Sequence, residues 1–301
     1  MVAVAPPFTR LYTHQHFWVS SPSAPLPRTT GLLFITPMQS QHLRSIVTSV
    51  AVGALFAAGA LPTSDRLVAS DNFRVENAVY VDRQKKPLNR STTIFHDGTA
   101  YDFMKTPAET VVFDKKAGRF ILLNLSRQTR SELTIGEVSA FADRLQQRAA
   151  KNPDPLVKFL AAPKFQEHFN ETTNELRLDS PWASYRLTLL AEENPMVVEQ
   201  YHDFCDWYAR LNALLTPGAL PPFGRLSVNA ALARHQAIPT QVLLTLSESK
   251  KLKRPRTVIR SEHRTVRPLN SADLERVEQT HKLLETFKPV RFEQYRKKGP
   301  R

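Results

Sequence analysis

Three residues with side chains that can bind metal ions recur at helical spacing in one segment of the chain. Glu199, His202 and Asp206 are three and four positions apart, so a helix would place them on adjacent turns of one face. Carboxylate and imidazole groups bind zinc and similar ions, and a bound ion could activate water for a hydrolase. Polar residues opposite an apolar helix face are more often simply solvated. We therefore predict no metal site and no cofactor, and we keep a metal-dependent hydrolase as a second alternative function.

The other common catalytic patterns are missing from the sequence. Its nine glycines form no G-x-G-x-x-G, P-loop or G-x-S-x-G pattern, and neither H-E-x-x-H nor C-x-x-C occurs. Cys205 is the single cysteine and follows Phe204 near the apolar side of its segment, which predicts a small core residue instead of a nucleophile. We predict that the protein is not an enzyme.

A group of aromatic residues could line a ligand cavity, because they recur at alternating or helical spacing. They are Trp182, Tyr185, Tyr201, Phe204, Trp207 and Tyr208. Aromatic side chains at such spacing also fill ordinary protein cores, and both interpretations stay open. As a cavity lining, they would accept a lipid or another apolar ligand.

Most of the excess positive charge lies near the C-terminal end. The chain has 41 Lys and Arg against 28 Asp and Glu, and residues 250–301 alone hold 16 basic and 6 acidic residues. The candidates for binding an anion are Lys250, Lys251, Lys253, Arg254, Arg256, Arg260 and Arg264. Spacings of two or four from Arg254 to Arg264 align several of them on one strand face, where they could contact phosphate groups. The alternative is that charge keeps an exposed strand edge soluble and unpaired.

Short alternating runs separated by turn signals predict an antiparallel sheet after residue 71. Phe73–Val81 alternates over its whole length, and Asp97-Gly98 is a strong signal for a tight turn. Further strands are expected at residues 93–95, 100–103, 110–113, 119–125, 129–134, 165–170, 175–179, 183–190, 240–247 and 256–267.

Four amphipathic helices are expected between and after these strands. The strongest begins at Pro195 after the N-cap Asn194 and ends at Leu215, with an aromatic face. The others are expected at residues 136–150, 228–236 and 271–287, the last capped by Ser271. We predict one α+β domain at residues 71–295, followed by a basic tail at 296–301. Its fold would be a strongly curved antiparallel sheet, an incomplete barrel of about ten strands whose concave side is covered by three or four amphipathic helices.

The order of these elements resembles that of the LolA/LppX-like envelope carriers, in which an incomplete antiparallel barrel packed by helices encloses a lipid-sized cavity. The residues that carry the resemblance are Tyr80–Met104, Thr110–Asn124 and Thr240–Ser249. They are strand and turn patterns, and the resemblance spans most of Asp71–Thr286. It implies binding of a lipid or acyl-bearing partner without catalysis.

An export signal is predicted upstream of the sheet. Arg44 precedes the uncharged run Ser45–Ser64, whose apolar part of 16 residues suits a signal peptide better than a membrane span of about 20. Cleavage could follow Ala60 or Ser70, and an uncleaved signal anchor is the alternative. Residues 38–70 thus form the predicted signal region. Residues 1–37, rich in Pro, Ser and Thr, are expected to be a disordered extension, with the true start at Met38.

These features predict an exported, non-enzymatic protein of the periplasm or cell envelope, soluble or signal-anchored, that binds a lipid or other apolar ligand in a curved-sheet cavity. The first alternative is an envelope scaffold that docks on an acidic protein partner or an anionic surface through its basic C-terminal region. No intracellular nucleic acid is expected as a partner, because an exported protein leaves the compartment that contains it.

Overall fold

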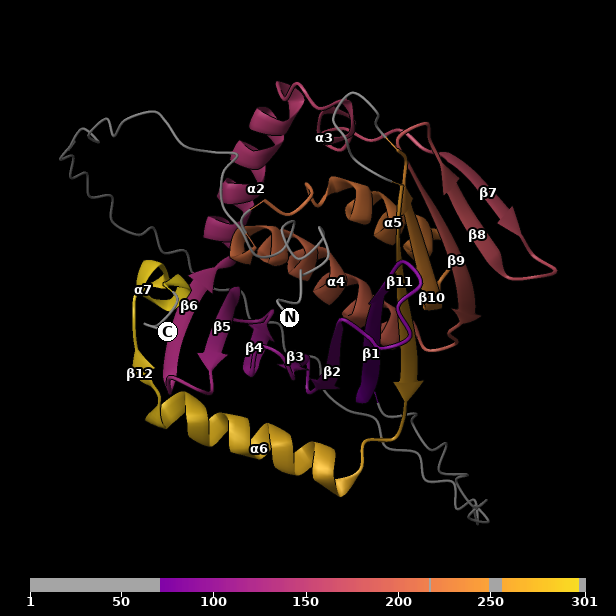
Figure 1. Ribbon diagram of the computed structural model, residues 1–301. Helices are drawn as coiled ribbons and strands as arrows, with labels where there is room; N and C mark the ends of the chain where they lie inside the picture. Colours follow the sequence, from indigo (N-terminus) through magenta and orange to yellow (C-terminus); the bar gives the residue numbers. More distant parts are fainter. Residues whose placement is uncertain (1–70, 217, 249–255, 298–301) are drawn as a thin grey trace, which may run out of the picture. The chain divides into compact units, whose positions relative to one another are not determined.

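A twelve-stranded sheet dominates the computed structural model, which describes residues 71–216, 218–248 and 256–297 (Figure 1). The strands are β1 (Phe73–Val81), β2 (Asn89–His96), β3 (Thr99–Met104), β4 (Glu109–Asp114), β5 (Arg119–Asn124), β6 (Thr129–Thr134), β7 (Gln166–Asn170), β8 (Glu175–Asp179), β9 (Ala183–Ala191), β10 (Ala237–Leu246), β11 (Thr257–Val266) and β12 (Lys288–Pro289). The helices are α2 (Ile135–Ala150), α3 (Pro155–Phe159), α4 (Pro195–Leu215), α5 (Phe223–Arg234), α6 (Ser271–Thr286) and α7 (Phe292–Arg296).

The strand order is β12-β6-β5-β4-β3-β2-β1-β11-β10-β9-β8-β7, with all pairs antiparallel except β12 with β6. The two edge strands do not pair with each other, so the curved sheet remains an incomplete barrel. The predicted α+β class and sheet type are confirmed. The helices α3 and α7 and the strand β12 were not predicted, because two to five residues are too few to show a periodic pattern.

Strand β1 lies in the middle of the sheet although it comes first along the described chain. On one side it forms a local antiparallel pair with β2, and on the other side it pairs with β11, where Arg74 faces Val266. The β2–β3 connection is the predicted tight turn, since Asp97 and Gly98 both have positive φ angles of 50° and 75°. Local hairpins build most of each half of the sheet, β9 and β10 are connected through α4 and α5, and the β1–β11 pair joins the halves.

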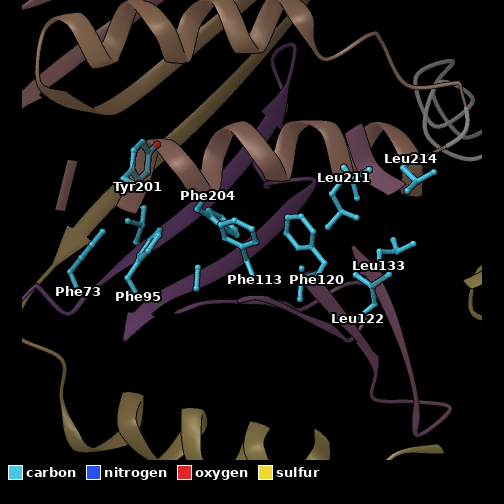
Figure 2. Packing of buried hydrophobic residues seen from close by; sticks show 14 of the residues in the cluster. Phe73, Phe95, Phe113, Phe120, Leu122, Leu133, Tyr201, Phe204, Leu211 and Leu214 are labelled. Carbon is cyan, nitrogen blue, oxygen red and sulfur yellow. The ribbon is translucent and has the colours of Figure 1, made fainter. Parts of the chain in front are cut away.

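The inner face of the sheet packs against α4 through a large apolar core. Figure 2 shows Phe95, Phe113 and Phe120 of the strands pointing toward Tyr201 and Phe204 of the helix, with Leu211 and Leu214 farther along. Helix α2 adds Val138 to this core. Beyond β11, a second core unites β8, β9 and β10 with Val228 and Leu232 of α5. The inner face is therefore the one covered by α2, α4 and α5.

Helix α6 packs on the outer face, so the prediction that the helices cover the concave side is wrong for this one. Its Val277 joins a separate core with strand residues Ile94, Tyr101, Val112, Ile121 and Leu123. These alternate in sequence with the inner-face residues, so the central strands are apolar on both sides. The predicted cap is also corrected: Asn270 is the N-cap, and its side chain accepts a hydrogen bond of 2.9 Å from the backbone N–H of Asp273.

In the part of the chain that the structure describes, no helix combines the length and the apolar character needed to cross a membrane. The predicted signal region at residues 38–70 and the predicted extension at residues 1–37 lie outside the described residues.

Candidate ligand site on the inner face of the sheet

A chain of polar side chains crosses four strands on the inner face, beside the aromatic core. Ser261 Oγ lies 3.0 Å from His263 Nε2, and His263 Nδ1 lies 2.8 Å from Asn77 Oδ1. The amide Nδ2 of Asn77 donates to Thr93 Oγ1 at 3.2 Å, and the Thr93 hydroxyl donates to Asp102 Oδ1 at 2.8 Å. Since Asn77 Oδ1 can only accept, His263 Nδ1 carries the proton and Nε2 accepts from Ser261. All four hydrogen bonds are thus donated in the same direction, from β11 through β1 and β2 to β3.

The last acceptor of this chain, Asp102, is 2% exposed and is also held from the helix side. The hydroxyl of Tyr208 on α4 donates to Asp102 Oδ2 at 2.8 Å. Burial raises the pKa of Asp102, and the hydroxyl donors Tyr208 and Thr93 oppose this effect. Burial, followed by the nearby Asp102 charge, raises the pKa of Tyr208 well above its usual value. Both carboxylate oxygens are therefore occupied by protein donors, and Asp102 anchors α4 to the sheet.

His263 is neutral in this arrangement. Burial lowers its pKa to about 3, and the positive charge of Arg225 on α5 acts in the same direction. An imidazole with both nitrogens occupied and such a low pKa is a poor general base near neutral pH. The polar chain therefore organises the inner face and offers no free acid or base.

Arg225 contributes a positive charge to this side of the sheet without a carboxylate partner among the described residues. The groups that interact with its guanidinium are Tyr201 and Cys205 of α4 and Tyr185 of β9, all of which are uncharged at neutral pH. Burial raises the pKa of the Cys205 thiol, and Arg225 only partly offsets this. A largely enclosed charge is normally paired in a folded protein. Arg225 is thus a positive charge with uncharged partners, and no carboxylate of the described residues pairs with it.

The inner-face residues of β1, β10 and β11 mix polar and apolar side chains. Strand pairing places Val242 opposite Ser261 and Leu244 opposite Ile259. Leu244, Ile259 and Ser261 are all half-buried, as is Val79 on β1. Such a surface can contact both the apolar body and the polar head of a ligand.

The six aromatic residues that were candidates for a cavity lining lie in different parts of the structure. Tyr185 and Tyr201 meet at Arg225, Tyr208 meets Asp102, and Phe204 belongs to the filled aromatic core. Trp207 packs at the edge of that core under the guanidinium of Arg210, which lies 5.1 Å from its ring centre. Trp182 packs in a separate cluster with α3. The structure thus brings two of the six to the unpaired guanidinium.

The sequence interpretation missed Arg225, Asp102 and His263. For Arg225 there is a weak signal, because it is a lone charge within the run Phe223–Ala233. The other two show no signal, since Asp102 lies in an ordinary alternating strand and His263 lies between charged residues of another.

The three candidate metal ligands, for which we predicted no metal site, have separate partners. Glu199 shares the ammonium of Lys115 with Asp203, His202 Nε2 lies 3.2 Å from the Ala237 carbonyl oxygen, and the Asp206 carboxylate accepts from Asn229. Glu199 and His202 line an open cleft of about 330 Å³, while Asp206 is absent from its lining. Among the described residues, no group of three His, Cys, Asp or Glu side chains is arranged to hold a metal ion.

The predicted anion-binding residues are only partly described. Four of them, Lys250, Lys251, Lys253 and Arg254, lie outside the described residues. Arg256 is exposed directly before β11, and Arg260 and Arg264 share one face of that strand, as predicted from their spacing. Arg260 pairs with Glu262, and Arg264 pairs with Glu76 of β1, with its Nε at 3.0 Å. Acidic neighbours therefore neutralise the two arginines of β11.

No family model matches the chain, and no curated protein matches its sequence. Among solved structures, the chain matches a LolA superfamily protein from Nitrosomonas europaea with 8% identity, over 67% of this chain and 89% of the other, at a TM-score of 0.25. A similarity this weak establishes neither family membership nor a function.

Proposed function

We propose that this protein is a non-enzymatic binding protein that holds an amphipathic molecule between the inner face of its curved sheet and helices α4 and α5. The negatively charged head of the molecule would lie at Arg225, and its apolar body would lie along the half-buried side chains of β10 and β11. A carboxylate or phosphate head fits best, because a guanidinium binds both with two parallel hydrogen bonds.

The observation that carries this proposal is the half-buried guanidinium of Arg225, which lies among uncharged groups. Its nearest partners are Tyr201, Cys205 and Tyr185, and no carboxylate of the described residues pairs with it. Desolvating a charge without a partner costs several kcal/mol, at the order-of-magnitude level. A bound anion would supply the missing partner.

The neighbouring polar chain supports binding over catalysis. Asp102 and His263 are both fixed by hydrogen bonds within the protein, so neither is free to move a proton to or from a substrate. They instead keep the inner face rigid and polar beside Arg225.

A fluorescent long-chain fatty acid tests this proposal with the full chain. We expect saturable binding to the wild type and a loss of about tenfold or more in affinity for Arg225→Met, because a charge-assisted pair is removed. Arg144→Met, on the exposed side of α2, is the matched control and should bind as the wild type does. The corresponding fatty alcohol should bind both proteins equally weakly. Undiminished fatty-acid binding by a folded Arg225→Met protein would contradict the proposal.

We also propose that the protein is exported, on the basis of Arg44 and the apolar run that follows it. An alkaline phosphatase fusion placed after Asp71 tests this in a Gram-negative host, since the enzyme becomes active only outside the cytoplasm. We expect activity from the natural sequence and its loss in Leu55→Arg, which puts a charge into the apolar run. Equal activity of the two fusions would rule out this run as the signal.

A further inference from the structure

The outer face of the sheet carries a second feature, a polar hollow over β8, β9 and β10. It has a volume of about 190 Å³, and most of its lining residues belong to the outer face. Helix α6 covers the outer face of β2 to β5, whereas these strands are covered there by no described helix. The hollow therefore shares Tyr185 with the inner-face site but has its own set of arginines.

Three guanidinium groups and one carboxylate line this hollow. Arg177 comes from β8, Arg186 from β9, and Arg256 from the residue directly before β11, while Asp179 is the single acidic member. The hydroxyl residues Ser184, Tyr185 and Thr245 complete the polar lining, and Leu243 is its apolar member. Positive charge is thus in excess, and hydroxyl groups are present to donate further hydrogen bonds.

The pairing of the strands makes this arrangement unfavourable when the hollow is empty. Arg177 and Arg186 are direct cross-strand partners in the β8–β9 ladder. Like charges placed directly opposite each other destabilise a sheet. Their carboxylate neighbours lie to the sides, Asp179 at 3.1 Å from Arg177 and Glu175 at 3.6 Å from Arg186. An anion between the two guanidiniums would remove the repulsion.

We propose that this hollow binds a phosphate group. Planar guanidinium groups match the oxygens of phosphate with paired hydrogen bonds, and three of them converge here. The volume is roughly six times the ~30 Å³ that a water molecule occupies in the liquid, and it is smaller than the ~300–1,000 Å³ of sites that enclose whole small molecules. The hollow therefore takes the phosphate of a ligand whose remainder stays outside, either a soluble phosphate ester or the head group of an anionic lipid.

The test uses the full chain and two probes. Binding of glycerol phosphate is measured by calorimetry, and binding of phosphatidylcholine vesicles with and without phosphatidylglycerol is measured by co-sedimentation. We expect the wild type to bind at least one probe, with a loss of about tenfold or more in Arg186→Met and in Arg177→Met. Arg186→Lys keeps the positive charge but lacks the planar guanidinium, so its affinity should lie between those of Arg186→Met and the wild type. Glycerol phosphate binding alone identifies a soluble ester, and vesicle binding that requires phosphatidylglycerol identifies a lipid head group.

Two controls separate this site from general positive charge. Arg144→Met removes the same charge elsewhere and should bind as the wild type does, and so should a chain with Lys250, Lys251, Lys253 and Arg254 changed to Gln. The side chains of Arg177 and Arg186 are 46% and 56% exposed, and replacing either one removes the repulsion between them, so neither replacement should lower the free energy of unfolding. The proposal is overturned if neither probe binds, if Arg144→Met lowers binding as much as Arg186→Met, or if only the four-residue change abolishes binding.

Discussion

The hydroxyl of Tyr208 on α4 and the carboxylate of Asp102 on β3, 106 positions apart in sequence, are joined by a hydrogen bond of 2.8 Å. Because Asp102 is buried, removing this donor leaves a carboxylate oxygen without its partner. We expect Tyr208→Phe to lower the free energy of unfolding by about 1–3 kcal/mol, measured by urea denaturation.

A double-mutant cycle checks the origin of this loss. In the Asp102→Asn background, the charge that needs the donor is gone, so the same Tyr208 change should cost less than it does in the wild type. Strictly additive effects of the two changes would show that the hydrogen bond is not responsible.

His263 should make stability depend on pH. Its folded-state pKa of about 3 lies below the usual 6.5, so the unfolded chain binds the proton first as the pH falls. Its contribution to stability is complete above about pH 7 and is lost between about pH 6.5 and pH 3. The loss reaches about 3 kcal/mol near pH 4.5. Unfolding free energies at several pH values should therefore fall less steeply on acidification for His263→Asn than for the wild type.

The raised pKa of Asp102 acts in the opposite direction, because the folded state binds that proton first. The effect of Asp102 is present in both the wild type and His263→Asn, so the difference between their pH slopes reports His263 alone. His168, which is exposed on β7, supplies the control, and His168→Asn should keep the wild-type slope. Identical slopes for His263→Asn and the wild type would contradict the buried neutral histidine.

Gly224 allows α5 to approach β9 and α3 closely. A Cβ atom there would lie 2.7 Å from Leu160 Cδ2 and 3.3 Å from the Tyr185 hydroxyl. Since Leu160 is itself buried, we expect Gly224→Ala to lower the midpoint of thermal unfolding, at a cost of about 1–3 kcal/mol. In Gly136→Ala the new Cβ has only Thr134 Oγ1 at 3.8 Å, so the gain in helix propensity should raise stability by up to about 1 kcal/mol. Equal effects of both substitutions would refute this close approach.

The N-cap of α6 is Asn270 and not its neighbour Ser271, and the two residues should therefore differ in their effect on stability. Asn270 accepts from the backbone N–H of Asp273, whose carboxylate accepts from the backbone N–H of Asn270 and from Arg74 of β1. We expect Asn270→Ala to cost about 1 kcal/mol in urea denaturation and Ser271→Ala to cost far less. A larger loss for Ser271→Ala would place the cap at the residue predicted from sequence.

The sequence was sufficient for features that depend on neighbouring residues. Alternation within Phe73–Val81, the Asp97-Gly98 turn and the Asn194-Pro195 start of α4 all lie in windows of a few residues, and the structure has each at the predicted position. The α+β class follows from these elements together, because their periods already distinguish strand from helix.

Tertiary structure alone decided which segments meet. The β1–β11 pair joins residues nearly two hundred positions apart, and it creates the polar chain from Ser261 to Asp102. The side of the sheet on which α6 packs was equally undetermined, since central strands that are apolar on both faces can accept a helix on either.

The same limit applies to the candidate sites. A run of basic residues is visible in the sequence, but whether each arginine has a carboxylate neighbour depends on strand register. That register gives Arg264 its partner Glu76 and sets Arg177 against Arg186. The packing of α5 leaves Arg225 among uncharged groups. Charge was determined by the sequence, and its compensation by the fold, because Coulombic pairing acts over a few ångströms in space and not along the chain.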